Sequence, residues 1–178
     1  MKKITKLAAL LLVAALSLTV LVGCVGTKPE DIDKYYSNVG EKLNATIVYG
    51  DYLLESAKGK IHVTSGKTEY YVEYTDAASY TYEKDSNGNW TKTADSKVQK
   101  QYNPLDSVAV SWKGSDYTYS KDIKGFKCET TVLLITTVQT LVFDGNNCTA
   151  TLKVGSASTS YAVSKVGSTK VSLPKVNA

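Results

Sequence analysis

Apolar and polar residues alternate with a period of two over much of this chain, beginning at Leu43. The alternation is found in residues 43–49, 61–63, 70–74 and 78–82. A period of two is typical of β-strands with one buried face, because successive side chains point to opposite faces. The last of these segments runs into DSNGN, in which Asn87 and Gly88 favour the positive φ angles of a tight hairpin turn. These short alternating segments, punctuated by turn residues, predict an antiparallel meander.

Two helices are expected beside these strands. Residues 29–42 begin with Pro29, carry three acidic residues in the first turn and repeat apolar residues at helical spacing. In the stretch YNPLDSVAVSW, Asn103 can cap a second helix whose apolar face would run from Leu105 to Trp112.

The second half of the chain is expected to add further strands. The apolar run from Val132 to Phe143 is rich in β-branched residues and is interpreted as one central or bent strand. Alternation then continues until Val171 and Leu173, before Pro174 closes the sheet. The sequence therefore predicts an α+β fold, with two helices and about nine to eleven antiparallel strands.

The first residues of the chain have the layout of a secretory signal. Three lysines precede a run without charge that extends from Leu7 to Thr27. Within it, Leu21, Val22, Gly23 and Cys24 resemble the lipobox of bacterial lipoproteins, in which the cysteine is acylated and becomes the new first residue. We therefore expect residues 1–23 to be a signal peptide, 24–28 a tether and 29–178 one domain.

Lipidation of Cys24 would anchor the protein outside the cytoplasm, on the bacterial cell membrane. Two acyl chains on one cysteine are enough for stable anchoring, whereas one chain binds only marginally. The alternative is an uncut helix, since the uncharged run is also long enough to cross the ~30 Å hydrocarbon core. Both alternatives place the following residues outside the cytoplasm.

Composition argues against several functions. All 21 basic residues are lysine, and loss of residues 1–23 would leave 18 lysines against 17 acidic residues. Such a balance does not suit nucleic-acid binding, and the absence of arginine disfavours bidentate recognition of phosphate. His62 is the only histidine, no G-x-S-x-G motif occurs, and too few histidines and cysteines are present for an ordinary zinc site. We expect no catalytic residues, no metal and no cofactor.

Two cysteines remain after Cys24. In an oxidising compartment, Cys128 and Cys148 are expected to form a disulfide, which would contribute ~3 kcal/mol by the loop-entropy model. The alternative is a pair of buried free thiols.

Tyrosine is unusually frequent, with 13 residues against two phenylalanines. A tyrosine ring is apolar and its tip is polar, which suits a binding concavity with a wet edge or a surface that contacts another protein. The simpler alternative is that the tyrosines build the core and its rim.

The order of these features resembles that of LolA-like lipoprotein carriers, from the lipobox through the helix and meander to the helix at NPLD. The ending VGSTKVSLPKV also resembles the last strand of that family, through Gly167, Ser168, Thr169, Val171, Leu173 and Pro174. The resemblance implies an antiparallel sheet curved into an unclosed half-barrel, with two helices on or near the concave face. Because this chain lacks arginine and carries an anchor, the resemblance implies ligand binding at the membrane rather than shuttling.

The function expected from these features is binding of a lipid or another hydrophobic molecule in the concavity. The expected lining residues share inward parity on neighbouring strands: Ile61, Val63, Tyr70, Val72, Tyr74, Tyr80 and Tyr82. The alternative is a surface module that contacts an envelope protein through a tyrosine-rich sheet face. A cavity of several hundred Å³ lined by these side chains would favour the first function, and a solid core with an exposed aromatic patch the second.

Overall fold

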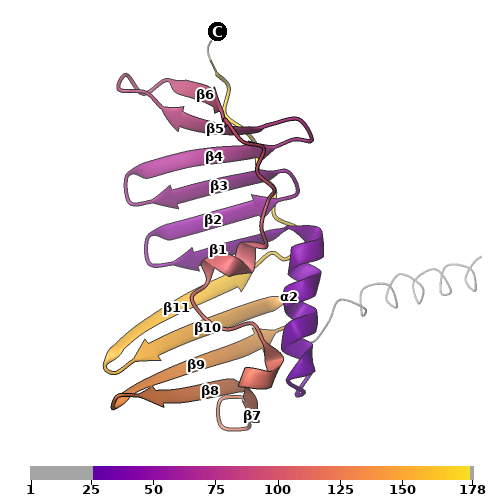
Figure 1. The fold of residues 1–178 in the computed structure, drawn as a ribbon, viewed down its shortest axis with the longest axis vertical. Helices are drawn as coiled ribbons and strands as arrows, with labels where there is room; N and C mark the ends of the chain where they lie inside the picture. Colours follow the sequence, from indigo (N-terminus) through magenta and orange to yellow (C-terminus); the bar gives the residue numbers. More distant parts are fainter. Residues whose placement is uncertain (1–25, 177–178) are drawn as a thin grey trace, which may run out of the picture.

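One antiparallel sheet of eleven strands dominates the computed structural model, which describes residues 26–176. The order of its strands is β6-β5-β4-β3-β2-β1-β11-β10-β9-β8-β7. The strands are β1 (Ala45–Tyr49), β2 (Tyr52–Ala57), β3 (Lys60–Ser65), β4 (Thr68–Tyr74), β5 (Ser79–Lys84), β6 (Trp90–Ala94), β7 (Thr118–Ser120), β8 (Gly125–Val132), β9 (Ile135–Asp144), β10 (Asn147–Val154) and β11 (Ala157–Ser164). The sheet is open, with β6 and β7 as its two edges (Figure 1).

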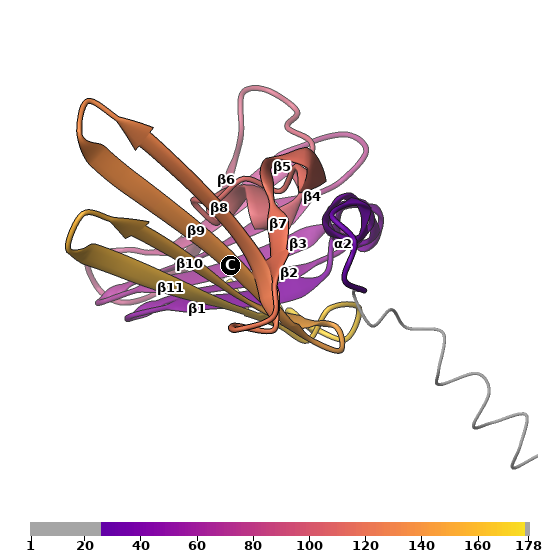
Figure 2. The same cartoon turned by 90° about the horizontal axis from the view of Figure 1, so that it is seen from below.

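Two runs of hairpins form this sheet, and they join where β1 pairs with β11, as in Ile47 opposite Val163. Residues 95–117, here called the crossing segment, carry the chain from the edge strand β6 to the edge strand β7. The crossing segment and helix α2 (Glu30–Lys42) lie on the same side of the sheet (Figures 1 and 2). This side is called the inner face.

Helix α2 confirms the expected N-terminal helix. Its buried residues Ile32, Tyr35 and Val39 recur at helical spacing, and its first turn is acidic, which complements the positive end of the helix dipole. The helix ends where Leu43 adopts the left-handed conformation and its N–H donates to the carbonyl of Val39 at 2.8 Å. The buried stripe faces the inner side of the sheet and forms one core with it.

The second expected helix is wrong, and the described residues contain one α-helix rather than two. Asn103 caps as expected, its side chain accepting from the N–H of Leu105 at 3.1 Å, but only the 3₁₀ turn η1 (Pro104–Ser107) follows. Val108 is extended, as β-branched residues prefer, and the chain bends through residues 108–110 instead of continuing the helix. A second turn, η2 (Gly114–Asp116), leads into β7. Trp112 still reaches the core and donates from Nε1 to the carbonyl of Leu105 at 3.1 Å.

The apolar run from Val132 to Phe143 is not one strand. Leu133 and Leu134 form a turn between β8 and β9, so that Val132 pairs with Ile135 across the hairpin. The neighbouring threonines continue this pairing, with Thr131 opposite Thr136. The run is therefore divided between the end of β8, a turn and nearly the whole of β9.

The last segment, residues 165–176, crosses the opposite side of the sheet, here called the outer face (Figure 1). Thr169 is hydrogen-bonded through Oγ1 to Oγ1 of Thr46 at 2.9 Å and accepts from Asn44 Nδ2. Residues 171–176 form no strand, which corrects the expectation that Val171 and Leu173 would pair with the sheet.

The expected disulfide is also absent, since Cys128 and Cys148 are free thiols. Cys128 lies opposite Gln139 and Cys148 opposite Phe143, so β9 separates the two cysteines. Two strand spacings and four residues of offset put their Cα atoms roughly 16 Å apart, far beyond the reach of a disulfide.

Candidate functional site

Cross-strand register decides which of the expected lining residues face the same side. Directly opposed residues of an antiparallel pair share a face. Ile61 lies opposite Val72 and Val63 opposite Tyr70, and all four side chains are on the inner face together with Tyr74. Five of the seven expected lining residues therefore lie on the same face of the sheet.

Tyr80 and Tyr82 are on the outer face, contrary to expectation. Glu73 lies opposite Tyr80 and Tyr71 opposite Tyr82, whereas Tyr74 lies opposite Ser79. The β4–β5 turn sets this register through hydrogen bonds between Thr75 and Ala78. A shift of one residue in register reverses every side chain of a strand, so parity counted along β5 alone could not assign its face.

Ile61 and Val63 do not line a surface either. They are only 3% and 4% exposed and lie within the packed core. Tyr70, Val72 and Tyr74 are half-buried against the same core and remain candidates for ligand contact.

Three further tyrosines join this surface that the sequence did not assign to it. Tyr49 and Tyr52 flank the β1–β2 turn with ring centroids 4.7 Å apart, and Tyr102 comes from the crossing segment. Tyr52 and Tyr74 both lie near Tyr70 and Tyr102. The inner tyrosine cluster is defined as Tyr49, Tyr52, Tyr70, Tyr74 and Tyr102. Period-two parity could have included Tyr49, which alternates with Ile47, but no local pattern places Tyr102.

The cluster is partly desolvated and carries free polar tips. Burial raises the pKa of Tyr52 to about 12, with a smaller contribution from Tyr70, and burial also raises the pKa values of Tyr70, Tyr74 and Tyr102. None of the five hydroxyls is hydrogen-bonded to another residue within 26–176. Since no polar side-chain atom in this range is buried without a partner, these hydroxyls reach solvent. The cluster therefore offers neutral aromatic rings with available hydroxyls.

A cavity of ≈ 560 Å³ adjoins the cluster at Tyr74. Its lining residues come from the end of α2, the β2–β3 turn, the end of β4 with the β4–β5 turn, and the crossing segment: Leu43, Lys58, Gly59, Tyr74, Thr75, Asp76, Val98, Gln99, Lys100 and Gln101. Gln101 holds the crossing segment there, accepting from the N–H of Gly59 at 2.7 Å and donating to Ser56 at 2.8 Å. The cavity is within the size range of small-ligand sites, ~300–1,000 Å³.

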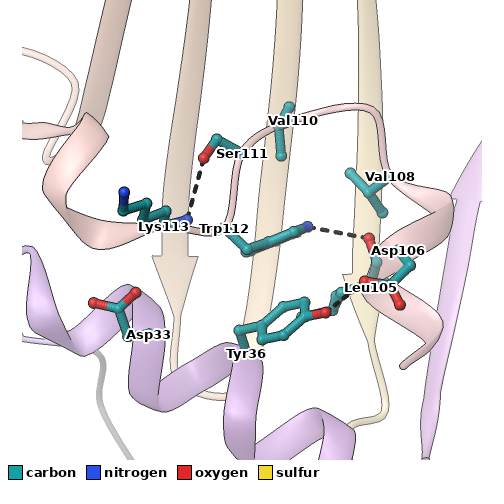
Figure 3. A pocket seen from close by; sticks show the side chains of 9 residues that line it. All are labelled: Asp33, Tyr36, Leu105, Asp106, Val108, Val110, Ser111, Trp112 and Lys113. Atoms are coloured by element: carbon teal, nitrogen blue, oxygen red, sulfur yellow. Dashed lines mark hydrogen bonds between the residues drawn. The ribbon is translucent and has the colours of Figure 1, made fainter. Parts of the chain in front are cut away.

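A second cavity of ≈ 480 Å³ lies between α2 and the crossing segment (Figure 3). It is lined by Asp33, Tyr36, Leu105, Asp106, Val108, Val110, Ser111, Trp112 and Lys113. Most of its polar groups are already paired: Tyr36 donates to Asp106 at 2.6 Å, and Asp33 accepts from the N–H of Gly114 at 3.0 Å. These bonds fasten the crossing segment to the helix, and the cavity offers few free polar groups to a ligand.

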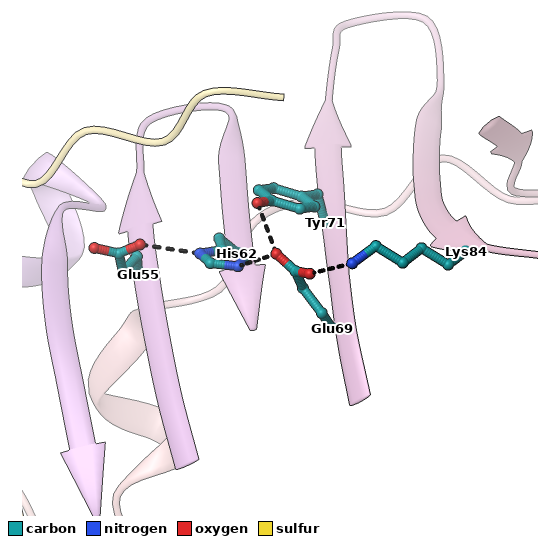
Figure 4. Close-up of polar contacts among 5 residues, drawn as sticks. All are labelled: Glu55, His62, Glu69, Tyr71 and Lys84. Carbon is teal, nitrogen blue, oxygen red and sulfur yellow. Dashed lines mark hydrogen bonds and ion pairs between the residues drawn. The ribbon is translucent and has the colours of Figure 1, made fainter. Parts of the chain in front are cut away.

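The outer face carries a network of charged and aromatic residues centred on His62 (Figure 4). The two ring nitrogens of His62 lie 3.0 Å from Glu55 and 3.3 Å from Glu69. Lys84 pairs with Glu69 at 2.8 Å and, with a donated bond from Tyr71, lowers the pKa of that carboxyl. These groups therefore form hydrogen bonds and ion pairs with one another from β2 to β5.

Tyr80 and Tyr82 belong to a neighbouring part of this face. Lys92 lies 3.9 Å from the ring centroid of Tyr80 and pairs with Glu73 at 3.0 Å. Tyr82 donates to the same carboxylate at 2.7 Å. The two tyrosines thus contact charged side chains of neighbouring strands on the outer face and do not contribute to the inner face.

Cys24, the expected site of lipidation, lies outside the described residues. Within residues 26–176, no three His, Cys, Asp or Glu side chains are grouped so that they could hold a metal ion. In the same part of the chain, no helix combines the length and apolarity needed to cross a membrane. Comparison with protein-family models, with curated proteins and with solved structures finds no match to this chain.

Proposed function

We propose that this chain is a membrane-anchored extracytoplasmic lipoprotein that binds a lipid or another hydrophobic molecule on the inner face of its open sheet. The observation that carries the proposal is the inner tyrosine cluster, where half-buried rings from β1, β2 and β4 and the exposed ring of Tyr102 lie beside a cavity of ≈ 560 Å³. The lipobox-like residues before the domain support the membrane location.

The chemistry of the cluster suits an amphipathic ligand. The rings supply apolar contact area, and the free hydroxyls can donate to an ester, carboxyl or phosphate oxygen of the ligand. Burial raises the pKa values of Tyr52, Tyr70, Tyr74 and Tyr102 above the ordinary value for tyrosine, so these four side chains remain neutral at physiological pH. A neutral, partly desolvated surface favours apolar chains over ions.

A protein-interaction module is the second candidate, and the outer face favours it. Trp90 packs edge-on against Tyr71 at 5.3 Å between centroids, and Lys84 lies 4.8 Å above its ring. Aromatic rings with interspersed charges are common at protein interfaces. The ligand proposal ranks first because the hydroxyls of Tyr71 and Tyr82 on the outer face already donate hydrogen bonds to Glu69 and Glu73 and are not free to contact a partner. No catalytic role is proposed, since both nitrogens of His62 are engaged by carboxylates.

Paired substitutions on opposite faces of neighbouring strands test the proposal. Tyr70→Ser removes a ring from the cluster, and Tyr80→Ser removes one from the outer face. With a pyrene-labelled fatty acid as the probe, Tyr70→Ser should weaken binding about tenfold, the equivalent of ~1.4 kcal/mol for one aromatic contact, while Tyr80→Ser should leave it unchanged.

Native mass spectrometry of the purified chain completes the test by showing whether a lipid copurifies. Equal weakening by the two substitutions, or no binding of the probe by the unaltered protein, would remove the inner face as a lipid site. Loss of a copurifying protein in Tyr80→Ser alone would favour the interaction module.

A further inference from the structure

Four consecutive aliphatic residues project from the end of the β8–β9 hairpin. Val132, Leu133, Leu134 and Ile135, here called the apolar tip, are 63%, 91%, 97% and 56% exposed. Leu133 and Leu134 are the most exposed large hydrophobic residues of the described chain. Exposure of single apolar side chains is ordinary, but a contiguous group that buries nothing within its own domain marks a contact site.

The neighbouring hairpin extends the apolar tip. Val154 ends β10 and is itself exposed, and the N–H of Gly155 donates to the carbonyl of Thr136 at 3.1 Å. This bond joins the β10–β11 turn to the start of β9, and the two hairpin ends lie side by side (Figures 1 and 2). The tip is therefore supported by a second hairpin.

The two leucines at the apolar tip occupy backbone conformations that leucine disfavours. Leu133 and Leu134 have φ angles of 49° and 67°, in the left-handed region that disfavours side chains with a Cβ. Six other hairpin turns of this sheet place a glycine at positive φ: Gly50, Gly59, Gly66, Gly88, Gly145 and Gly155. A turn with two such positions prefers Asn-Gly. Leucine at both positions therefore serves neither the turn nor the core.

The chemistry of the apolar tip fits the hydrocarbon of a bilayer. Its four side chains carry no charge and no aromatic ring, and four residues are far fewer than the roughly 20–30 that each partner contributes to a standard protein interface. Val132 pairs with Ile135, which satisfies backbone groups that an apolar medium could not. Thr131 and Thr136 lie directly behind the tip with their hydroxyls 3.0 Å apart, and with the tip in the hydrocarbon these polar groups would lie toward the lipid headgroups.

The position of the tip agrees with a membrane along the edge of the sheet that ends in β7. Helix α2 begins near this edge, since the N–H of Gly114 in η2 bonds Asp33 at 3.0 Å. The β8–β9 hairpin belongs to the same edge, as Figure 1 shows. A bilayer along that edge would meet both the start of the domain and the apolar tip.

We propose that the apolar tip inserts into the lipid bilayer to which the chain is anchored, as a second contact that fixes the orientation of the domain. This inference rests on the proposed membrane location, and it adds a site that is separate from the inner tyrosine cluster. The occupant is lipid, and a protein partner is an outcome that the test below would reveal.

Depth-dependent quenching tests the insertion. The full chain is reconstituted in vesicles of phosphatidylethanolamine and phosphatidylglycerol whose acyl chains are brominated, and Leu134→Trp is compared with Ser86→Trp in the polar β5–β6 turn. Bromine should quench the added emission severalfold more at position 134 than at position 86, above the background of Trp90 and Trp112. Equal quenching at the two positions, or none at 134, overturns insertion. If the emission of the Leu134→Trp variant is protected only when a protein extract is added, the tip belongs to a protein contact instead.

A second variant separates insertion from a role in folding. In Leu133→Asn with Leu134→Gly, the turn gains its preferred residues, so the melting temperature in detergent should rise. Ile135→Trp in this background should lose the quenching that Ile135→Trp alone shows. A lower melting temperature would mean that the leucines stabilise the fold, which overturns the inference.

Flotation of the same proteins with the vesicles reports on the anchor separately. Floating protein with an unquenched tip refutes only the insertion. Failure of the unaltered chain to float refutes the proposed anchor.

Discussion

Tyrosine has three separate roles in this protein, and the hydroxyl distinguishes them. In the core, Tyr35 donates to the carbonyl of Asn146 at 3.0 Å and Tyr117 to that of Ser111 at 2.7 Å, so a large ring is buried with its polar tip satisfied. On the outer face, Tyr71 and Tyr82 donate to carboxylates. In the inner tyrosine cluster, five neighbouring hydroxyls have no partner among residues 26–176 and reach solvent. The role of a tyrosine therefore follows from its position, and the grouping of five free hydroxyls on the inner face is what points to a ligand.

The two thiols give a prediction at the same scale. Burial raises the pKa of Cys148 well above its ordinary value, which keeps that thiol protonated and unreactive. Cys128 is partly exposed. Alkylation of the native protein, followed by peptide mapping, should modify Cys128 and spare Cys148, and both should react in denaturant without reductant.

A different labelling pattern would be informative in either direction. If neither cysteine reacts in denaturant until a reductant is added, a disulfide exists and the strand arrangement between β8 and β10 is wrong. Equal reactivity of the two thiols in the native state would show that β10 is not packed as described.

At the scale of the elements, the alternating segments and the N-terminal helix could be predicted, because each is encoded by local spacing. The face of a strand could not be, since it depends on register. The β4–β5 turn, with Thr75 bonded to Ala78, shifts β5 by one residue and moves Tyr80 and Tyr82 to the outer face. The turn in the apolar run was missed for a similar reason. Leu133 and Leu134 carry no turn signal, because leucine disfavours positive φ and is a residue expected in the core.

The crossing segment shows how a correct local signal can give a wrong element. Asn103 and Pro104 do start a helical turn, but the following valines leave the helix and the segment is fixed by tertiary bonds. Ser111, for example, donates its N–H to the side chain of Gln139 on β9 at 2.7 Å. The capping pattern therefore identifies where a helix begins but does not determine how long it is.

Asn103 is the residue that connects the crossing segment to α2. Its side chain accepts from the N–H of Leu105 and donates to the carbonyl of Tyr36 at 2.9 Å. Asn103→Ala removes both bonds and should cost about 1–2 kcal/mol, the usual cost of losing a cap together with a satisfied carbonyl. Chemical denaturation measures this free energy of unfolding. Asn87→Ala in the exposed β5–β6 turn is the control and should change it much less. A similar loss in both variants would mean that the segment is held by other contacts.

At the scale of the whole molecule, one part of the inner face is packed into the core and another part is exposed to solvent. Helix α2 and the apolar side chains of the crossing segment cover the centre of the sheet, where Ile47, Leu54 and Leu141 are fully buried. The tyrosines of β1, β2 and β4 lie beyond that cover and remain half-exposed. An open sheet lets one face serve both purposes, because its strands continue past the helix that shields their middle (Figure 2).

Val72 lies at the boundary between these two regions, which makes it the position that separates a binding surface from a packed one. It is half-buried beside the tyrosine cluster and lies opposite the buried Ile61. Val72→Asp should keep a cooperative melting transition, lowered by several degrees, because the new carboxylate can reach solvent at the edge of the cluster. It should also abolish binding of an apolar probe, since a charge would then lie among the contacting rings.

Leu54→Asp is the control for a fully buried position. Leu54 is fully buried on the same face, and an unpaired carboxylate there should unfold a domain of ordinary stability. Melting and probe binding are recorded together for both variants. If Val72→Asp unfolds as Leu54→Asp does, and the unaltered protein never binds the probe, this face is solid core and the outer face becomes the surface to examine for a protein partner.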